Sequence, residues 1–134
     1  MANEHEIIHE THIPIPFTVA DGTGIERGTL CKMTDPKTAV KSDGDADIVA
    51  GVLAEEKIAS NGVTSAPIYR GGVFKATASG SITVGDALIT LTGADNILGT
   101  AAVNSENIVG TSLETATNGE TFFYELNPRG INLS

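Results

Sequence analysis

The 134-residue chain has no tryptophan, and it contains only four phenylalanines and two tyrosines. Its core must therefore be mainly aliphatic. The same shortage argues against a carbohydrate-binding site, because such sites usually place exposed aromatic rings against sugar faces. A chain of this length can form one domain that buries about two thirds of its unfolded surface.

Basic residues are also scarce. Eight lysines and arginines stand against 17 acidic residues, which gives a net charge of −9. Binding to nucleic acid or to an anionic membrane depends on positive charge, so the composition disfavours both kinds of partner. We interpret the acidic surface as one that keeps copies soluble until a specific partner binds.

The chain has a single cysteine, Cys31, so it cannot form an intrachain disulfide. Cys31 lies inside a predicted strand, where it is expected to be a small apolar packing residue. No apolar run approaches the ~20 residues that span a bilayer. The segment Met1 to Glu10 is polar and acidic, so we expect no signal peptide and a soluble protein made in the cytosol.

The first 16 residues differ from the rest of the chain. They are acidic, contain all three histidines and end with Pro14 and Pro16. Two prolines this close exclude a regular helix and favour extended backbone. We therefore predict an extended N-terminal arm over residues 1–16 and a single β-rich domain over residues 17–134.

A pattern of turns and apolar runs occurs twice in the sequence, at an offset of about 57 to 60 positions. The first copy includes Gly24–Leu30, Ile48–Leu53 and the turn at Asn61-Gly62. The second includes Ser81–Leu88, Ile108–Leu113 and the turn at Asn118-Gly119. Two copies are too few for a solenoid, so we predict two similar β units that close around one core. The arm and the segment 69–74 have no evident counterpart.

Turn signals recur roughly every 8 to 12 residues, which is typical of an all-β sandwich or barrel. We predict a mainly β fold, a compact β-sandwich or barrel of short strands with little helix. A helix over 50–58 competes with a strand at Ile48–Ala54, but Gly51 and the β-branched residues favour the strand. Expected strands cover 17–20, 29–33, 39–40, 48–54, 64–69, 73–77, 82–86, 87–91, 97–103, 108–113 and 121–126, with a turn or bulge at 70–72.

Candidate metal and phosphate sites are weak. Asp43, Asp45 and Asp47 are spaced as in a calcium loop, but the loop's required Gly and Glu positions hold Ile48 and Ala54. We expect a solvated acidic turn, with a weak cation site as the alternative. The histidines at 5, 9 and 12 are spaced like one face of a helix, but the prolines interrupt that helix. Metal binding would therefore require the N-terminal arms of three chains to meet on the axis of a trimer. The glycine pairs 22/24 and 71/72 lack the P-loop pattern and are predicted turns.

We find no catalytic constellation and predict that the chain is not an enzyme and uses no cofactor or metal. No Ser or Cys has an evident His partner, because every histidine lies in the arm. A hydrolase on a β scaffold would need a pocket with clustered carboxylates or histidines.

Five short features occur in an order that resembles the head decoration, or capsid cement, proteins of tailed phages. They are Ile25–Leu30, Gly51–Ala54, Gly72-Val73-Phe74, Ile82-x-x-Gly85-Asp86, and Val109-Gly110-x-Ser112-Leu113 before Asn118-Gly119. The resemblance covers roughly residues 17 to 127. Lambda-type members are similar at Ile48–Ala54 and at the hairpin 66–75, but they contain more Pro and Trp.

The resemblance implies a β-rich homotrimer at three-fold and quasi-three-fold positions on the outer surface of a virion. Its partner would be the major capsid protein, and an N-terminal segment would contact it. An extended arm can add to a sheet edge on the shell. We therefore predict capsid binding by Ile7, Ile8, Ile13, Ile15 and Phe17, and a subunit interface at Tyr69, Arg70 and Phe74. The alternative function is a carbohydrate- or cell-surface-binding β module of a phage tail or fibre.

Overall fold

The computed structural model describes residues 3–34, 37–92, 96–101 and 107–129, and all regular secondary structure in these ranges is β. This confirms the predicted mainly β fold. No helix in the described ranges is long and apolar enough to cross a membrane. The strands are β1 (Glu6–His9), β2 (Ile15–Thr18), β3 (Leu30–Thr34), β4 (Thr38–Lys41), β5 (Val49–Leu53), β6 (Ser65–Tyr69), β7 (Gly72–Ala78), β8 (Ala87–Thr90), β9 (Ile97–Thr100), β10 (Ile108–Ser112) and β11 (Thr121–Arg129).

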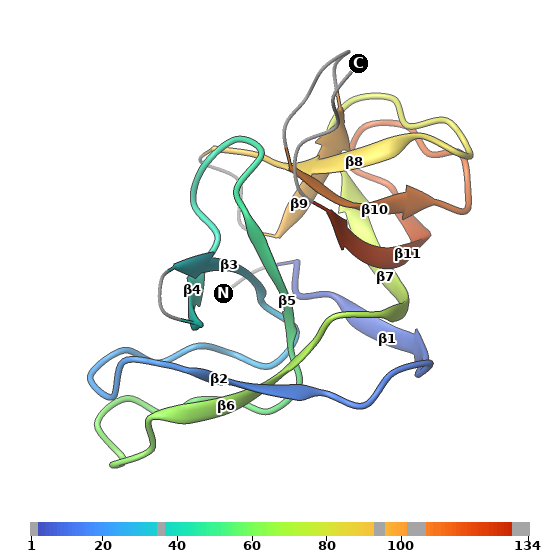
Figure 1. The fold of residues 1–134 in the computed structure, drawn as a ribbon. Coiled ribbons are helices and arrows are strands. Elements are labelled where there is room, and N and C mark those ends of the chain that lie inside the picture. The colour runs from blue at the N-terminus through green and yellow to red at the C-terminus, as the bar shows by residue number, and fades with distance from the viewer. Residues whose placement is uncertain (1–2, 35–36, 93–95, 102–106, 130–134) are drawn as a thin grey trace.

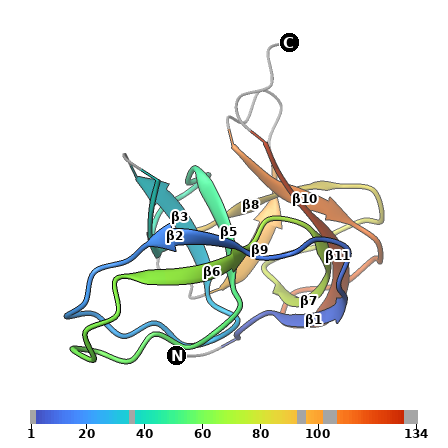
Figure 2. The same ribbon diagram turned by 60° about the horizontal axis from the view of Figure 1, so that its bottom comes forward.

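The strands form two small closed barrels. The first barrel has the order β2-β4-β3-β5-β6, and it lies at the lower left of Figure 1. The second barrel contains β7 to β11 and closes through a parallel pairing of β7 with β9. Strand β1 is added to the second barrel as an antiparallel neighbour of β7, as Figure 1 and Figure 2 both show.

The two barrels have the same topology, so the doubled sequence pattern corresponds to a doubled structure. Strands β2 to β6 match β7 to β11 in order, and each barrel closes through a parallel pairing of its first and third strands. An isolated bridge between Ile25 and Lys57 matches one between Ile82 and Ala116. The segment after Tyr69 has a counterpart after all, because β7 is equivalent to β2.

The prediction of one shared core is wrong, because each five-stranded unit closes on itself and encloses its own side chains. The interior of the first barrel is one cluster that includes Phe17, Cys31 and Ile68. The interior of the second barrel is another, which includes Phe74, Leu88 and Tyr124. Cys31 is a packing residue, as predicted, and burial raises the pKa of its thiol to about 12.

Strand β5 lies between the two barrels, and all five of its residues are buried. A β-bulge at Ala50–Gly51 interrupts the alternation of side chains, so both halves of β5 supply residues to the interior of their own barrel and to the contact with the second barrel. Ala50 and Leu53 belong to the first core, whereas Val49 and Val52 join Leu30 in the cluster of the second barrel. The predicted doubly buried strand is confirmed, and the competing helix is wrong.

Several strand predictions differ from the structure. Strand β2 covers Ile15–Thr18 rather than 17–20, and β1 was not among the expected strands. Residues 82–86 form no named strand, because Ile82 makes a single bridge and Asp86 instead accepts a hydrogen bond from the Thr83 N–H. The strand predicted over 97–103 ends at Thr100, and residues 102 and 103 lie outside the described ranges. Strand β11 extends beyond Leu126 to Arg129, where it pairs with Ile108.

The acidic turn at 43–47 connects the first barrel to the second through hydrogen bonds. The Asp47 carboxylate accepts hydrogen bonds from the Ser42 hydroxyl and from the Asp43 and Gly44 N–H groups. Thr90 of β8 receives the Asp47 N–H at 2.8 Å and donates to the Gly44 carbonyl at 2.7 Å. Among the described residues there is no group of three or more His, Cys, Asp or Glu that could hold a metal ion.

Lys57 is a buried cation in the first barrel. Its ammonium group donates to the Asp21 carbonyl and carboxylate, the Ile58 carbonyl and the Asn61 side chain, at 2.5 to 3.2 Å. We expect Lys57→Met to lower the free energy of unfolding by about 2–4 kcal/mol, since it leaves these acceptors unpaired. Chemical denaturation measures the effect.

Lys32 supplies the matched control for this lysine. It pairs with Asp43 at 2.7 Å, but both side chains are partly exposed. Such surface pairs contribute little, so Lys32→Met should change stability by less than about 1 kcal/mol. Equal effects of the two substitutions would contradict the role given to Lys57.

Candidate functional site

The N-terminal segment joins the two barrels. Strand β1 pairs with β7 of the second barrel, and β2 is the first strand of the first barrel. The connection between them, residues 10–14, passes from one barrel to the other (Figure 2). The segment is extended, as the prolines indicate, and the predicted boundary at residue 16 falls within β2. The division into 1–16 and 17–134 stays a prediction.

His5 anchors the start of this segment between the barrels. Its ring is 4% exposed, with Nδ1 2.5 Å from the Tyr124 hydroxyl and Nε2 2.7 Å from the Asn96 carbonyl. A neutral ring that donates from Nε2 and accepts at Nδ1 satisfies both partners. Burial lowers the pKa of His5 to about 4, so the ring is neutral at pH 7. Its backbone N–H also donates to the Gly28 carbonyl at 2.7 Å.

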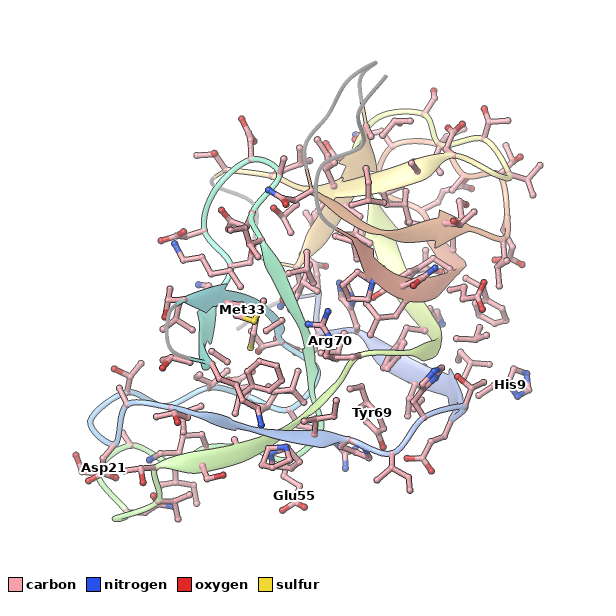
Figure 3. The ribbon with its side chains drawn as sticks, viewed as in Figure 1. His9, Asp21, Met33, Glu55, Tyr69 and Arg70 are labelled. Carbon is pink, nitrogen blue, oxygen red and sulfur yellow. The ribbon has the colours of Figure 1, made fainter. Side chains whose placement is uncertain are left out.

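The connection between β6 and β7 also lies where the two barrels meet, and Figure 3 shows Tyr69 and Arg70 there. The Tyr69 hydroxyl donates to the Glu10 carboxylate at 2.7 Å, and this hydrogen bond raises the pKa of Tyr69. Arg70 Nη1 donates to the carbonyls of Val49 and Ala50 at 3.2 and 3.0 Å. These contacts within the chain hold both predicted interface residues in place.

The structure separates the predicted contact residues into surface and core. Ile13 is 87% exposed and Ile15 39% exposed, whereas Ile7 and Ile8 are half-buried. Phe17 packs inside the first barrel at 4% exposed, whereas Ile15 lies on the same face of β2 two residues earlier, at the start of the strand, and is less covered.

Phe74 is the equivalent residue in the second barrel and is 1% exposed. In each barrel this phenylalanine lies on the first strand and packs in the interior. The side chains of Phe17 and Phe74 therefore have core roles in the protomer and offer no surface to a partner.

The outer edge of β2 is poorly suited to strand addition. Pro16 lies opposite Pro67, so the hydrogen-bonded positions of the β2–β6 ladder are those of Ile15 and Phe17. The alternate positions, Pro14 and Pro16, therefore face the outer edge and lack N–H donors. Thr18 on the same edge already donates to the Lys37 carbonyl at 3.1 Å. A partner is therefore expected to contact side chains here rather than add a strand.

A hollow of about 240 Å³ lies between the barrels beside β1. Its walls contain no Ser, Thr or Cys that could act as a nucleophile, and the buried His5 on its wall is fully occupied by Tyr124 and Asn96. Of the two tyrosines, Tyr124 is buried, and Tyr69 is half-buried with its hydroxyl donating to the Glu10 carboxylate.

Comparison with protein families identifies the chain. A model of the phage cement protein family matches residues 8–126, which include all strands of both barrels except the last three residues of β11. The chain belongs to the phage cement protein family. A search of curated proteins finds no match.

A solved structure supports the fold of this cement protein. The crystal structure of the head fibre gp8.5 N base in bacteriophage phi29 matches it with a TM-score of 0.55 and 17% identity. The match covers 90% of this chain and 98% of the other. The resemblance noted in the sequence is thus confirmed, and the cement protein is a capsid-associated phage protein of a structural family.

Sequence reasoning missed several residues that the structure makes prominent. Ile48, Val84 and Leu113 are exposed apolar residues, at 54%, 59% and 44%. An alignment of Phe17 with Phe74 would have extended the sequence repeat. It would then have shown that these three apolar residues stand at positions where the two copies differ. No local signal reveals His5 or Lys57, since their partners lie on distant segments.

Proposed function

We propose that the cement protein binds the outer surface of a phage capsid as a homotrimer at three-fold and quasi-three-fold positions and stabilises the shell. The capsid contact is centred on Ile13 and Ile15, with Ile7 and Ile8 behind them. The observation that carries this assignment is Ile13, a large apolar side chain left 87% exposed beside two rigid prolines. Its partner would be the major capsid protein.

The geometry suits a ready-made contact. Residues 10–14 are held at one end by β1 and at the other by β2, and Glu10 is tied to Tyr69. Little conformational freedom is lost when such a segment binds. A ligand that binds only the assembled shell stabilises it by mass action, and three linked contacts raise the avidity.

Point substitutions test this proposal better than deletion of residues 1–16, which would also remove β1, His5 and two residues of β2. Complete burial of the Ile13 side chain against the capsid would contribute about 2 kcal/mol to the binding free energy of each chain. We therefore expect Ile13→Asp to weaken binding to capsids of the encoding phage by at least roughly 30-fold. Co-sedimentation with purified capsids measures the change.

Ile58→Asp is the matched control, because Ile58 is also an exposed isoleucine, at 58%, but belongs to the loop between β5 and β6 and not to the N-terminal segment. It should bind like the wild type. Unchanged binding of Ile13→Asp, or equal losses in both variants, would refute the assigned surface.

A further inference from the structure

The loop between β5 and β6 brings an amine, a carboxamide and a carboxylate together at one end of the first barrel, where Figure 3 labels Asp21. Lys57 Nζ lies 2.9 Å from Asn61 Oδ1 and 3.2 Å from Asp21 Oδ1. The Lys57 side chain is 0% exposed, whereas the Asp21 side chain is 42% exposed. A lysine amine and an asparagine carboxamide can condense to an amide with loss of ammonia, and a neighbouring carboxyl group can move the protons.

The amine is held close to the carboxamide from several sides. Lys57 Nζ also donates to the Asp21 carbonyl at 2.9 Å and to the Ile58 carbonyl at 2.5 Å. The backbone of Lys57 forms a bridge with Ile25, with both N–H···O distances at 2.8 Å. A nucleophile that is fixed beside its target needs no further loss of freedom to react, and such proximity accelerates reactions between side chains strongly.

The Asn61 carboxamide is oriented for attack at its carbon. Its Oδ1 accepts from the Val63 N–H at 3.0 Å as well as from Lys57. Two donors on one atom establish which end of the carboxamide faces the amine. The Val63 N–H would also stabilise the negative charge that develops on Oδ1 during the attack. The carbon is one C=O bond, about 1.2 Å, from Oδ1, so a small rotation of either side chain brings Nζ over it.

The departing nitrogen and the proton carrier are also in place. Asn61 is exposed, and within the described ranges its Nδ2 has no hydrogen-bond partner, so ammonia can leave into solvent. The Asp21 carboxylate accepts from the Gly62 N–H at 2.7 Å, which fixes it beside both Lys57 and the Asn61 turn. Asp21 can therefore exchange protons with the attacking nitrogen and with the leaving nitrogen.

We propose that Lys57 and Asn61 become joined by an isopeptide bond, with Asp21 as the acid–base group. Asp21 takes one proton from the Lys57 ammonium, and the neutral amine attacks Asn61 Cγ. Asp21 then gives its proton to Nδ2 and removes a second proton from Nζ. The Nζ–Cγ bond forms, the Cγ–Nδ2 bond breaks, and ammonia leaves and takes up the proton from Asp21 as ammonium. Nothing is oxidised or reduced, and a small fraction of neutral amine suffices because ammonia is lost to solvent.

The product fits the same site. The new amide nitrogen keeps one hydrogen, which can donate to the Asp21 carbonyl that the ammonium group contacts now. The two joined residues are four positions apart, so the bond closes a short loop that the fold has already formed. It replaces an ion pair, which salt screens, with a covalent link that salt does not affect.

A competing reaction at Asn61 also releases ammonia. In an Asn-Gly dipeptide the glycine nitrogen can attack the side-chain carbon to give a cyclic imide, which water then opens. Here the Gly62 N–H is bound to Asp21 at 2.7 Å. Asn118-Gly119 is an internal control, because Asn118 Oδ1 accepts from the Gly80 N–H and no lysine of the described chain hydrogen-bonds to it.

Mass spectrometry of the purified full chain tests the proposal. The folded wild type should be lighter than its sequence by one ammonia, and trypsin should not cleave after Lys57. Fragment spectra should show residues 57 and 61 joined, while the peptide that contains Asn118 should have no cross-link. A chain that is purified and kept in denaturant should retain its full mass and lose ammonia only after refolding.

Three variants assign the roles. Lys57→Met should keep its full mass, because it has no amine. Asp21→Asn should slow bond formation at least roughly a hundredfold, since it still accepts from the Gly62 N–H but cannot carry protons. Glu55→Gln is the matched control, because it removes an exposed carboxylate of the same loop, and the bond should form at the wild-type rate.

A folded wild type that keeps its full mass and a cleavable Lys57 after prolonged incubation would overturn the proposal without reference to any variant. Loss of ammonia that persists in Lys57→Met would also overturn it, because the product would then be the cyclic imide. Bond formation at the wild-type rate in Asp21→Asn would refute the role given to Asp21.

Discussion

Alanine at Gly51 or at Gly110 should destabilise the protein by about 3 kcal/mol or more, the largest effect expected of any single methyl group in the chain. A Cβ on Gly51 would collide with the Tyr69 carbonyl oxygen, and one on Gly110 with the Glu125 carbonyl oxygen. Both obstacles are backbone atoms, which cannot move aside as a side chain would. Gly51 also has φ of 142°, a conformation that alanine adopts with strain.

The two glycines occupy equivalent positions, on β5 and β10, where the partner strand crosses closely in a tightly coiled five-stranded barrel. Denaturant unfolding of each variant measures the loss. Gly22→Ala is the control, because a Cβ there meets nothing within 4 Å and the backbone is not left-handed. It should stay within about 0.5 kcal/mol of the wild type. Wild-type midpoints for Gly51→Ala and Gly110→Ala would contradict the described crossing.

Acid should weaken the protein through His5. The folded-state pKa of about 4 lies below the ordinary value of 6.5, so the unfolded chain binds the proton more tightly. The stability contributed by the neutral ring is complete above pH 6.5 and is lost as the pH falls from 6.5 to 4. The difference between the two pKa values sets the loss at about 2–3 kcal/mol at pH 4.5.

Comparison with His5→Gln isolates this loss. Other groups also respond to acid, such as Glu120, whose pKa is lowered by a hydrogen bond from the Thr117 N–H, but they respond alike in both proteins. The variant should be less stable at pH 7.5, because glutamine cannot satisfy both Tyr124 and Asn96 with the same geometry, and it should lose less on acidification. If the wild type and His5→Gln lost equal free energy of unfolding between pH 7.5 and 4.5, the His5 ring would not be held neutral between the barrels.

Most of the strands follow from the sequence, because they depend on local alternation and on turns such as Asn61-Gly62 and Asn118-Gly119. The doubled pattern also reflects real topology. The number of cores could not be derived in this way, since it depends on which strands close on each other. The parallel closures of β2 with β4 and of β7 with β9 join segments that no turn signal connects.

The candidate contact surface was predictable only in part. Composition and the prolines locate Ile13 and Ile15 on an extended segment, and the structure leaves both exposed. The role of Phe17 needed its strand face, which depends on a register fixed by pairing with Ala66. A shift of one residue would reverse the faces of β2, so sequence alone could not assign Phe17 to the interior.

The placement of β1 has a consequence for the order of folding. Each barrel is built from a continuous stretch of chain, so the first can close during synthesis once β6 has left the ribosome. The hydrogen bond between His5 and Tyr124 cannot form until Tyr124, 119 positions later, has been synthesised. Contacts of such separation form late, because the intervening chain must first be ordered. We expect the N-terminal strand, although made first, to be the last element to lock into place.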